Sequence, residues 1–299
     1  MNEYIEVGQR IYEHRDRSDF SRQRFVVFCM RAFLHGAEVR ELQRFFQSDA
    51  SLAALEQGNA IFYEQLTRHV FYHQSTVRER LALLKQHFAF CTAVFAPDAL
   101  QKIYYDGRIS LWEAPYGDAL LSLGLAFKYV DRKEGLLTID LQLAGKRVYH
   151  ITFSFCRAEN QLLAIRIGAL QGSYGGQELI HGLTKYCFGY RPKNLILFAL
   201  RLLAQGLAVR RIYAVSNRGF FTNTHVRLDK KLKASLDDFW QEVGGRQMQD
   251  VRFFELPVAE TRKQLEEVKS QKRNLYRKRY IFLDEIEAQF KKNLPGYLK

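Results

Sequence analysis

The spacing of apolar residues divides the chain into regions of different periodicity. Between Phe25 and Phe95 apolar side chains recur at steps of three and four residues, as at Leu81, Leu84 and Phe88. This period places them on one face of a helix, so the N-terminal region is predicted to form several amphipathic helices. Ala96-Pro97-Asp98 closes this helical section.

From residue 101 to residue 170 the period changes to two, which is typical of strands. Asp106-Gly107 separates two alternating runs and predicts a first hairpin. Ala144-Gly145 separates 136–143 from 148–155 and predicts a second, and 162–170 predicts a further strand. We therefore expect about five antiparallel strands here.

Beyond residue 170 the pattern becomes strand, glycine-rich turn, helix and strand. The run 195–204 has helical composition, Arg211–Val215 is a short apolar strand, and a final helix is expected over 258–292. We predict an α+β fold in which an N-terminal helical section packs on a mixed, mainly antiparallel sheet, with a long basic C-terminal helix. The expected parts are 1–98, the α/β core 99–257, and 258–299.

Composition narrows the class of protein. Of 299 residues 47% are hydrophobic, which excludes disorder, and 19 Gly with 5 Pro are too few for a collagen-like chain. The first thirty residues lack the apolar core of a signal peptide, and no apolar run approaches ~20 residues. The four cysteines form no CxxC pair. These features predict a cytoplasmic protein, with peripheral association with the inner membrane as a further option.

The net charge of +13 favours an anionic partner: nucleic acid, an acidic lipid surface or a phosphorylated small molecule. The excess is concentrated in 190–233 and 261–280, and the second region carries eight Lys or Arg against two Glu. No helix-turn-helix, zinc-finger or RNP motif accompanies it, which argues against sequence-specific DNA binding. The predicted anion-binding residues are Arg191, Lys193, Lys272, Arg273, Arg277, Lys278 and Arg279.

The glycine-rich turn carries the most specific local pattern. A strand that ends in such a turn before a helix exposes backbone N–H groups beside a positive helix end, which suits a phosphate. The predicted cofactor-binding residues are Gln171, Gly172, Ser173, Gly175 and Gly176. The alternative is a tight turn whose glycines only supply positive φ angles.

Named motifs narrow the chemistry of this turn. A Ser hydrolase would need G-x-S-x-G, but Gln171 stands where the first glycine belongs. The Gly-Lys-Ser/Thr motif of ATPases and the G-x-G-x-x-G motif of dehydrogenases are both absent. These observations argue against all three functions. Residues 135–215 instead resemble the strand order of GNAT acyltransferases, whose Q/R-x-x-G-x-G/A loop holds the pyrophosphate of coenzyme A. Tyr174 occupies the place of the first loop glycine, so the spacing is one residue too long. The resemblance implies an acyl-CoA or acyl-carrier phosphopantetheine as ligand.

Catalytic candidates are few. Ser216 and Asn217 follow the strand that ends at Val215, and Glu178 with His181 lie three apart at a predicted helix start. The alternatives are a polar turn for the first pair and helix-surface decoration for the second. His69 and His73 are four apart, but no H-E-x-x-H glutamate accompanies them, so no metal is predicted.

Several ordered blocks resemble the VirK/YbjX family of Gram-negative bacteria, in particular its YbjX branch. They include 169–172, 189–197, 214–217, 237–245, 255–257 and 272–280. The resemblance implies a role in enterobacterial virulence and envelope homeostasis, including resistance to antimicrobial peptides and lipid A-related functions. It supplies no catalytic residues. Three hypotheses stay open: a GNAT-like acyltransferase, a non-catalytic basic protein that binds an anionic membrane surface or RNA, or a protein whose glycine loop and basic helix form a protein–protein docking surface.

Overall fold

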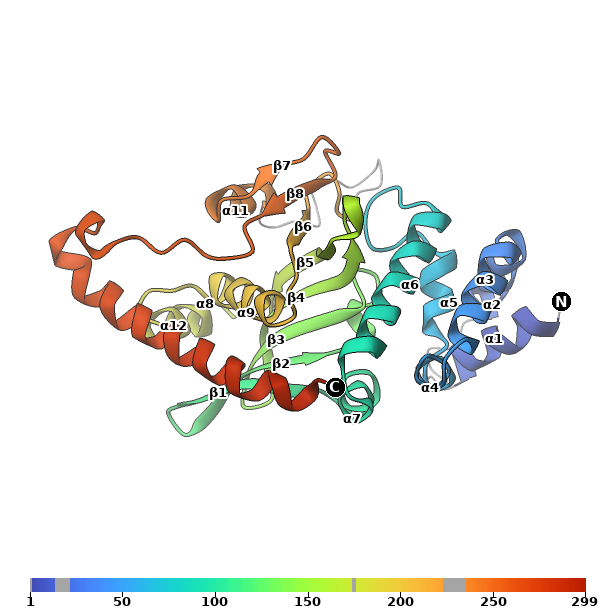
Figure 1. Ribbon diagram of the computed structural model, residues 1–299, viewed down its shortest axis with the longest axis horizontal. Helices are drawn as coiled ribbons and strands as arrows, with labels where there is room; N and C mark the ends of the chain where they lie inside the picture. The colour runs from blue at the N-terminus through green and yellow to red at the C-terminus, as the bar shows by residue number, and fades with distance from the viewer. Residues whose placement is uncertain (1, 14–21, 174–175, 223–234) are drawn as a thin grey trace.

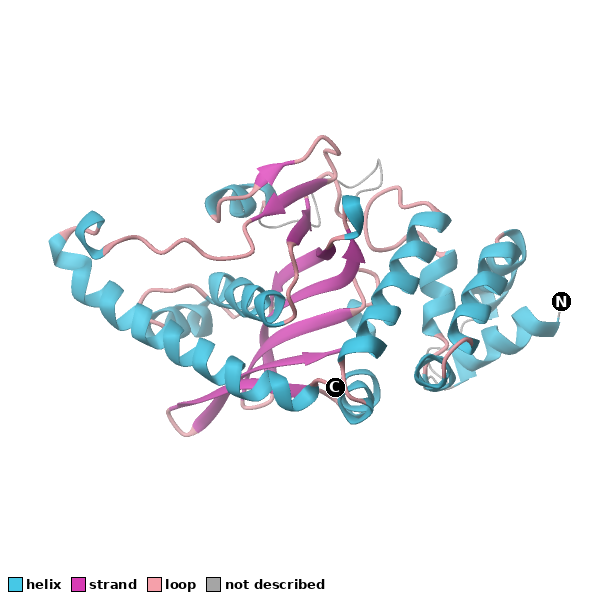
Figure 2. Cartoon of the chain, in the orientation of Figure 1, coloured by secondary structure: helices cyan, strands magenta, loops and turns pink. Residues whose placement is uncertain are grey.

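A mixed sheet of eight strands organises the molecule (Figures 1 and 2). The computed structural model describes residues 2–13, 22–173, 176–222 and 235–299. The strands are β1 (Ile109–Tyr116), β2 (Ala119–Ala126), β3 (Leu137–Leu143), β4 (Lys146–Arg157), β5 (Leu163–Gly172), β6 (Arg211–Val215), β7 (Arg246–Gln247) and β8 (Phe253–Leu256). Their spatial order is β1-β2-β3-β4-β5-β6-β8-β7.

One parallel pair interrupts an otherwise antiparallel sheet. β1 to β5 form a meander, and β6 then pairs with β5 in parallel. β8 pairs with β6 and β7 in the antiparallel sense. Helices α8 (Gln177–Tyr186) and α9 (Pro192–Gly206) make the crossover that a parallel pair requires. The fold is therefore α+β with the predicted GNAT-like strand order.

The N-terminal helical section lies beside one end of the sheet (Figure 1). It comprises α1 (Asn2–Glu13), α2 (Arg22–Leu34), α3 (Gly36–Gln47), α4 (Ala50–Gly58), α5 (Ile61–Thr67), α6 (Val77–Val94) and α7 (Pro97–Gln101). Thr76 caps α6 through a capping box with Glu79. Phe62 packs between Phe46 and Phe88, so apolar burial joins α3, α5 and α6.

His87 connects α6 to the sheet. Its Nδ1 accepts a hydrogen bond from the backbone N–H of Phe155 at 3.0 Å, so the ring proton lies on Nε2, which is 2.7 Å from the hydroxyl of Tyr104. The ring is fully buried and stacks on Phe155. Burial lowers the pKa of His87 from 6.5 to about 3.

Helix α12 (Arg273–Asn293) runs diagonally across the sheet (Figure 1). It contacts β1 directly and also contacts α9, which packs on β3, β4 and β5. Phe282 of α12 contacts the ring of Trp112 in β1. Near β6, the short helix α11 (Leu236–Glu242) places Trp240 so that its indole N–H donates to the carbonyl of Val215 at 2.8 Å. Both tryptophans are buried.

Two predicted elements are wrong. The expected hairpin at Asp106-Gly107 does not form, because 102–106 make a π-helical turn after α7 and Gly107, at φ 138°, ends it before β1. The first hairpin turns instead at Gly117, between β1 and β2. The final helix begins at Arg273, not near residue 258, because the preceding segment runs over the surface in short 3₁₀ turns.

The four cysteines are free; Cys91, Cys156 and Cys187 are buried, whereas Cys29 is half-buried. Among the described residues, no helix is both long and apolar enough to cross a bilayer.

The depressed pKa of His87 predicts acid-sensitive stability. Below pH 6.5 His87 is protonated in the unfolded chain but stays neutral in the native state. The free energy of unfolding is therefore largest at neutral pH and falls as the pH approaches 3. Between pH 7.5 and pH 5 this residue should cost about 2 kcal/mol of unfolding free energy. Urea unfolding at both pH values should show a smaller pH dependence in His87→Gln, whereas His181→Gln, at an exposed site, should match wild type. Equal pH dependence in all three proteins would contradict the assignment.

Candidate functional site

A row of polar side chains crosses the middle strands of the sheet. Asp140 of β3 is paired with His150 of β4, and His150 is paired with Gln171 of β5. Thr138 and Thr152 form the neighbouring pair, with their hydroxyls 3.3 Å apart. Because these positions alternate with core residues, their side chains share one face of the sheet. Asp140, His150 and both threonines are buried, which is costly unless they have partners.

The segment before β3 lies directly on this face. It begins with the 3₁₀ turn Tyr129–Asp131 and reaches β5, where a Cβ added at Gly168 would lie 1.7 Å from the carbonyl oxygen of Glu134. No side chain fits at Gly168, so glycine there permits the contact. Gln65 of α5 donates to the carbonyl of Arg132 at 2.7 Å and supports the segment from the helical section.

This approach assembles a cluster of Asp131, Glu134 and His150, here called the acid–histidine cluster. One potential ligand atom from each residue lies within 4.8 Å of the others. His150 Nε2 is 3.6 Å from Asp131 Oδ1. Glu134 Oε1 accepts from the side-chain amide of Gln171 at 2.8 Å. Gln171, the first residue of the predicted cofactor-binding loop, therefore links that loop to the cluster.

Burial sets the protonation of the cluster. Burial, together with the smaller effect of the Asp131 charge, raises the pKa of Glu134 to about 7, while Gln171, Arg147 and Lys133 act in the opposite direction. Burial lowers the pKa of His150 to about 4, although Asp131 opposes that shift. At neutral pH the imidazole of His150 is therefore uncharged, and Glu134 exchanges its proton near neutral pH rather than near its usual pKa.

A second ion pair extends the polar face toward β2. Arg108 contacts Asp140 at 3.0 Å and donates to the hydroxyl of Ser122 at 2.8 Å. Gln142 donates to the other oxygen of Asp140 at 2.7 Å. Asp140 is thus fully engaged and stays outside the acid–histidine cluster.

The glycine loop follows β5 as predicted. β5 ends at Gly172, the backbone N–H of Ser173 donates to the carbonyl of Val148 at 2.9 Å, and Gly176 is the N-cap of α8. Gly175 lies outside the described residues. A Cβ at Gly172 would lie 2.7 Å from the ring of Tyr149, and Arg191 is near enough to lower the pKa of Tyr149 against the larger effect of burial. The loop and a predicted anion-binding residue thus approach the same tyrosine.

β5 extends beyond its parallel partner. β5 and β6 are paired from Ala164–Arg211 to Ile167–Ala214, and β6 ends one residue later. Within the described residues, β5 continues to Gly172 paired with β4 alone. The edge of β5 is therefore released from β6 shortly before the glycine loop.

The predicted catalytic residues lie apart from the cluster. Glu178 and His181 are exposed on α8. Ser216 donates to the carbonyl of Val251 at 2.7 Å, and Asn217 accepts from the backbone N–H of Leu236 at 2.8 Å. These bonds hold the turn after β6 against α11 and against the segment that precedes β8, as expected if Ser216 and Asn217 form a polar structural turn. His69 and His73 both follow the end of α5, so they do not share a helix face.

The predicted anion-binding residues separate into two groups. Arg191 and Lys193 form ion pairs with Glu242, and both Nε and Nη2 of Arg279 donate to the carbonyl of Phe188. Arg191 and Arg279 line a pocket of about 440 Å³ between the start of α9 and α12. The other residues, Lys272, Arg273, Arg277 and Lys278, are exposed at the start of α12.

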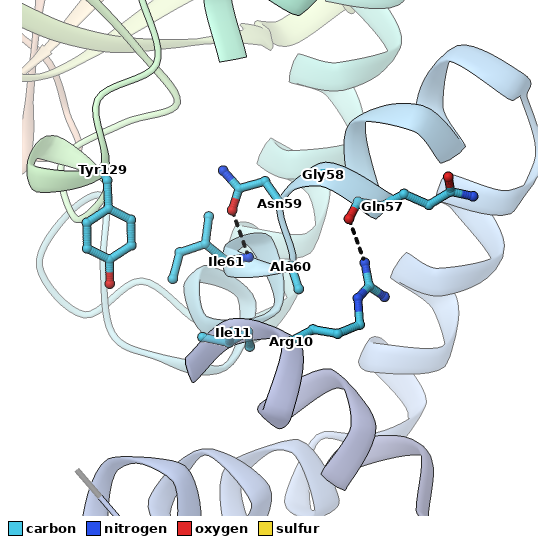
Figure 3. A pocket seen from close by; sticks show the side chains of 8 residues that line it. All are labelled: Arg10, Ile11, Gln57, Gly58, Asn59, Ala60, Ile61 and Tyr129. Atoms are coloured by element: carbon cyan, nitrogen blue, oxygen red, sulfur yellow. Dashed lines mark hydrogen bonds between the residues drawn. The ribbon is translucent and has the colours of Figure 1, made fainter. Parts of the chain in front are cut away.

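A smaller pocket of about 280 Å³ lies between α1, the α4–α5 connection and Tyr129 (Figure 3). Arg10 donates to the carbonyl of Gln57 in its wall, and the side chain of Asn59 accepts from the N–H of Ile61. Tyr129 begins the 3₁₀ turn that carries Asp131, so this pocket adjoins the segment that builds the cluster.

Sequence reasoning missed the acid–histidine cluster. Asp131 and Glu134 look like a charged turn, and His150 is sixteen residues or more from both in the sequence. The available signal was polar alternation, at Thr138, Asp140 and His150, on strands whose other face is strongly apolar. Polar residues that alternate along a strand either face solvent or form a buried polar network. Thr138, Asp140 and His150 are buried, so they form a network.

The fold and the cluster define an α+β protein with a mixed eight-stranded sheet and a buried acid–histidine cluster beside a glycine loop. A family model described as "Protein of unknown function (DUF535)" matches residues 17–292, so the chain belongs to that family. The resemblance to VirK/YbjX proteins is confirmed, because "Uncharacterized protein YbjX" of Escherichia coli (strain K12) is 37% identical over 162 residues.

The relatives are similar over different lengths. The alignment with YbjX covers 52% of this chain and 48% of YbjX, and one Haemophilus influenzae protein is 32% identical over 56% of this chain and 55% of its own length. The chain thus spans about half the length of these two relatives. "Membrane protein LapB" of Mannheimia haemolytica is 21% identical over 71% of this chain and 91% of its own length. No solved structure matches.

Substitution of Gly168 tests the contact that builds the cluster. Gly168→Ala should reduce the unfolding free energy by about 3 kcal/mol, because the new methyl group would collide with the backbone of Glu134. Gly296→Ala is the control, since nothing lies within 4 Å of its added Cβ. Urea unfolding monitored by circular dichroism measures both, and a cost below about 0.5 kcal/mol at Gly168 would show that the segment does not press on β5.

Proposed function

We propose that the protein is a GNAT-like acyltransferase that takes its acyl group from acyl-CoA or an acyl-carrier phosphopantetheine. The observation that carries this proposal is the release of β5 from β6 after Ile167, followed at once by the glycine loop and α8. In GNAT-like strand order, this is the region where the donor binds. The family setting favours an acceptor connected with the cell envelope.

The loop has the chemistry required to hold the donor's phosphates. Ile180 donates to the carbonyl of Gly176, so the backbone N–H groups of residues 177–179 come before the first α-helical hydrogen bond and point toward the loop. Among the described residues, only the carbonyl oxygen of Ser173, at 3.6 Å, lies near a Cβ added at Gly176. Positive helix ends and unoccupied N–H groups favour anions.

Gln171 provides the connection to the reacting end. It is the first residue of the loop motif, and its amide donates to Glu134 in the acid–histidine cluster. A donor phosphate near the loop and an acceptor near the cluster would thus lie on the two sides of one side chain. The exposed Glu178 and His181 are less suited to proton transfer, since solvent surrounds them.

Titration calorimetry with CoA, acetyl-CoA and a long-chain acyl-CoA tests this function. Gly176→Asp should weaken binding about tenfold, because a negative charge at the N-terminus of α8 repels phosphate. Asp is also a favourable N-cap residue, so the variant should fold. Gly176→Asn is the matched control, because it caps the helix without charge and should bind like wild type. Absence of heat with every CoA species, or equal binding by the Asp variant, would refute the proposal.

A second function, binding to an anionic membrane surface, is favoured by the start of α12. Lys272, Arg273, Arg277 and Lys278 are exposed, and no ion pair joins them to a carboxylate within the described residues. Exposed cations near anionic lipid each contribute about 1 kcal/mol. The relative named a membrane protein is consistent with such a location, and RNA would be the competing polyanion.

Vesicle sedimentation distinguishes this surface from general basicity. Charge reversal at Arg273, Arg277 and Lys278 should abolish binding to phosphatidylglycerol vesicles at 50 mM salt, whereas reversal at Lys291 and Lys292, at the opposite end of α12, should reduce it only slightly. Equal losses in both variants would point to net charge alone. Retention of RNA binding with loss of vesicle binding would support the lipid surface.

A further inference from the structure

The donor atoms of the acid–histidine cluster are arranged as a set of metal ligands would be. Asp131, Glu134 and His150 each offer one atom, and the three atoms lie within 4.8 Å of one another. Ligands held at about 2.0–2.2 Å from one ion are roughly 3–4 Å apart, so small side-chain rotations would close the set. Asp131 and Glu134 come from the segment that contacts Gly168 of β5, and His150 comes from β4, which pairs with β5.

A second observation concerns the imidazole itself. His150 is 8% exposed, and its Nε2 is buried with no hydrogen-bond partner among the described residues. A buried ring nitrogen without a partner costs free energy, so native structures rarely leave one unless another group occupies the site. Nε2 lies 3.6 Å from Asp131 Oδ1 and is therefore directed into the cluster.

The hydrogen bonds around the carboxylates leave one oxygen of each for a ligand. Thr138 and Arg147 donate to Oδ2 of Asp131, and Gln171 donates to Oε1 of Glu134. No hydrogen bond within the described part of the chain is recorded for Oδ1 or Oε2. Such outer partners orient ligating carboxylates in metal sites.

We propose that Asp131, Glu134 and His150 bind a divalent transition-metal ion. One imidazole nitrogen and two carboxylate oxygens suit Zn²⁺ or Mn²⁺ better than Mg²⁺, which keeps most of its water ligands. Three protein ligands leave a coordination position open, as in catalytic rather than structural sites. None of its three ligands belongs to the glycine loop, although Gln171 of that loop donates to Glu134, so metal binding and acyl-donor binding can be measured separately.

Direct metal binding by the full chain tests the proposal. Protein stripped with dipicolinate and dialysed is titrated with Zn²⁺, Mn²⁺ and Mg²⁺ by calorimetry, and its melting temperature is followed in parallel. We expect one Zn²⁺ or Mn²⁺ per chain with micromolar or tighter affinity, and a melting temperature raised by about 5 °C at saturation. Absence of stoichiometric binding by the wild-type chain overturns the site, whatever the variants do.

Variants then locate the ion. His150→Gln and Glu134→Gln should each weaken binding at least tenfold, with circular dichroism confirming the fold. The matched control is the double variant His69→Gln/His181→Gln, which removes two exposed imidazoles and should bind like wild type. Binding that is lost in this control but kept in His150→Gln and Glu134→Gln would assign the metal to surface histidines and overturn the proposal. Intact metal binding with no CoA binding would reject the acyltransferase function and leave this site standing.

Discussion

The contact of Glu134 with Gly168 is the constraint on which the site depends. It brings a segment that precedes β3 onto β5, two strands away in the sheet. The same segment is supported by Gln65 of α5, so the helical section and the sheet meet at this place. If residue 168 carried a side chain, Asp131 and Glu134 could not share a buried environment with His150. Backbone close packing thus determines the electrostatics of the centre.

Much of the fold follows from periodicity, because strands and helices buried on one face repeat their apolar residues regularly. Arg211–Val215 and the β3–β4 hairpin lie where the sequence predicts them. The Asp106-Gly107 turn fails because the residues before it continue the helical winding of α7 instead of pairing. The start of α12 was also misplaced, since a charged segment that packs along the surface has no apolar period to mark its boundary.

The candidate site also has one part that the sequence predicts and one part that it does not. The glycine loop could be predicted because a phosphate loop is contiguous in sequence, and Gln171 does lie at its start. The acid–histidine cluster could not, because it is made by a tertiary approach between positions that sequence spacing does not relate. The predicted catalytic candidate Asn217 shows the converse error: it lies close to a strand end, but its side chain accepts a hydrogen bond from the first residue of α11.

The two tryptophans lie at different strands of the sheet, so each can report on its own part of the sheet through its fluorescence. Trp112 lies in β1 against Phe282 of α12, and Trp240 donates its indole N–H to the last residue of β6. An indole held by a backbone carbonyl in a dry site emits at shorter wavelength than one in water, and its emission changes when that bond is lost. Rearrangement at the end of β6 would therefore be visible in the fluorescence of a chain that keeps only Trp240, without any label attached.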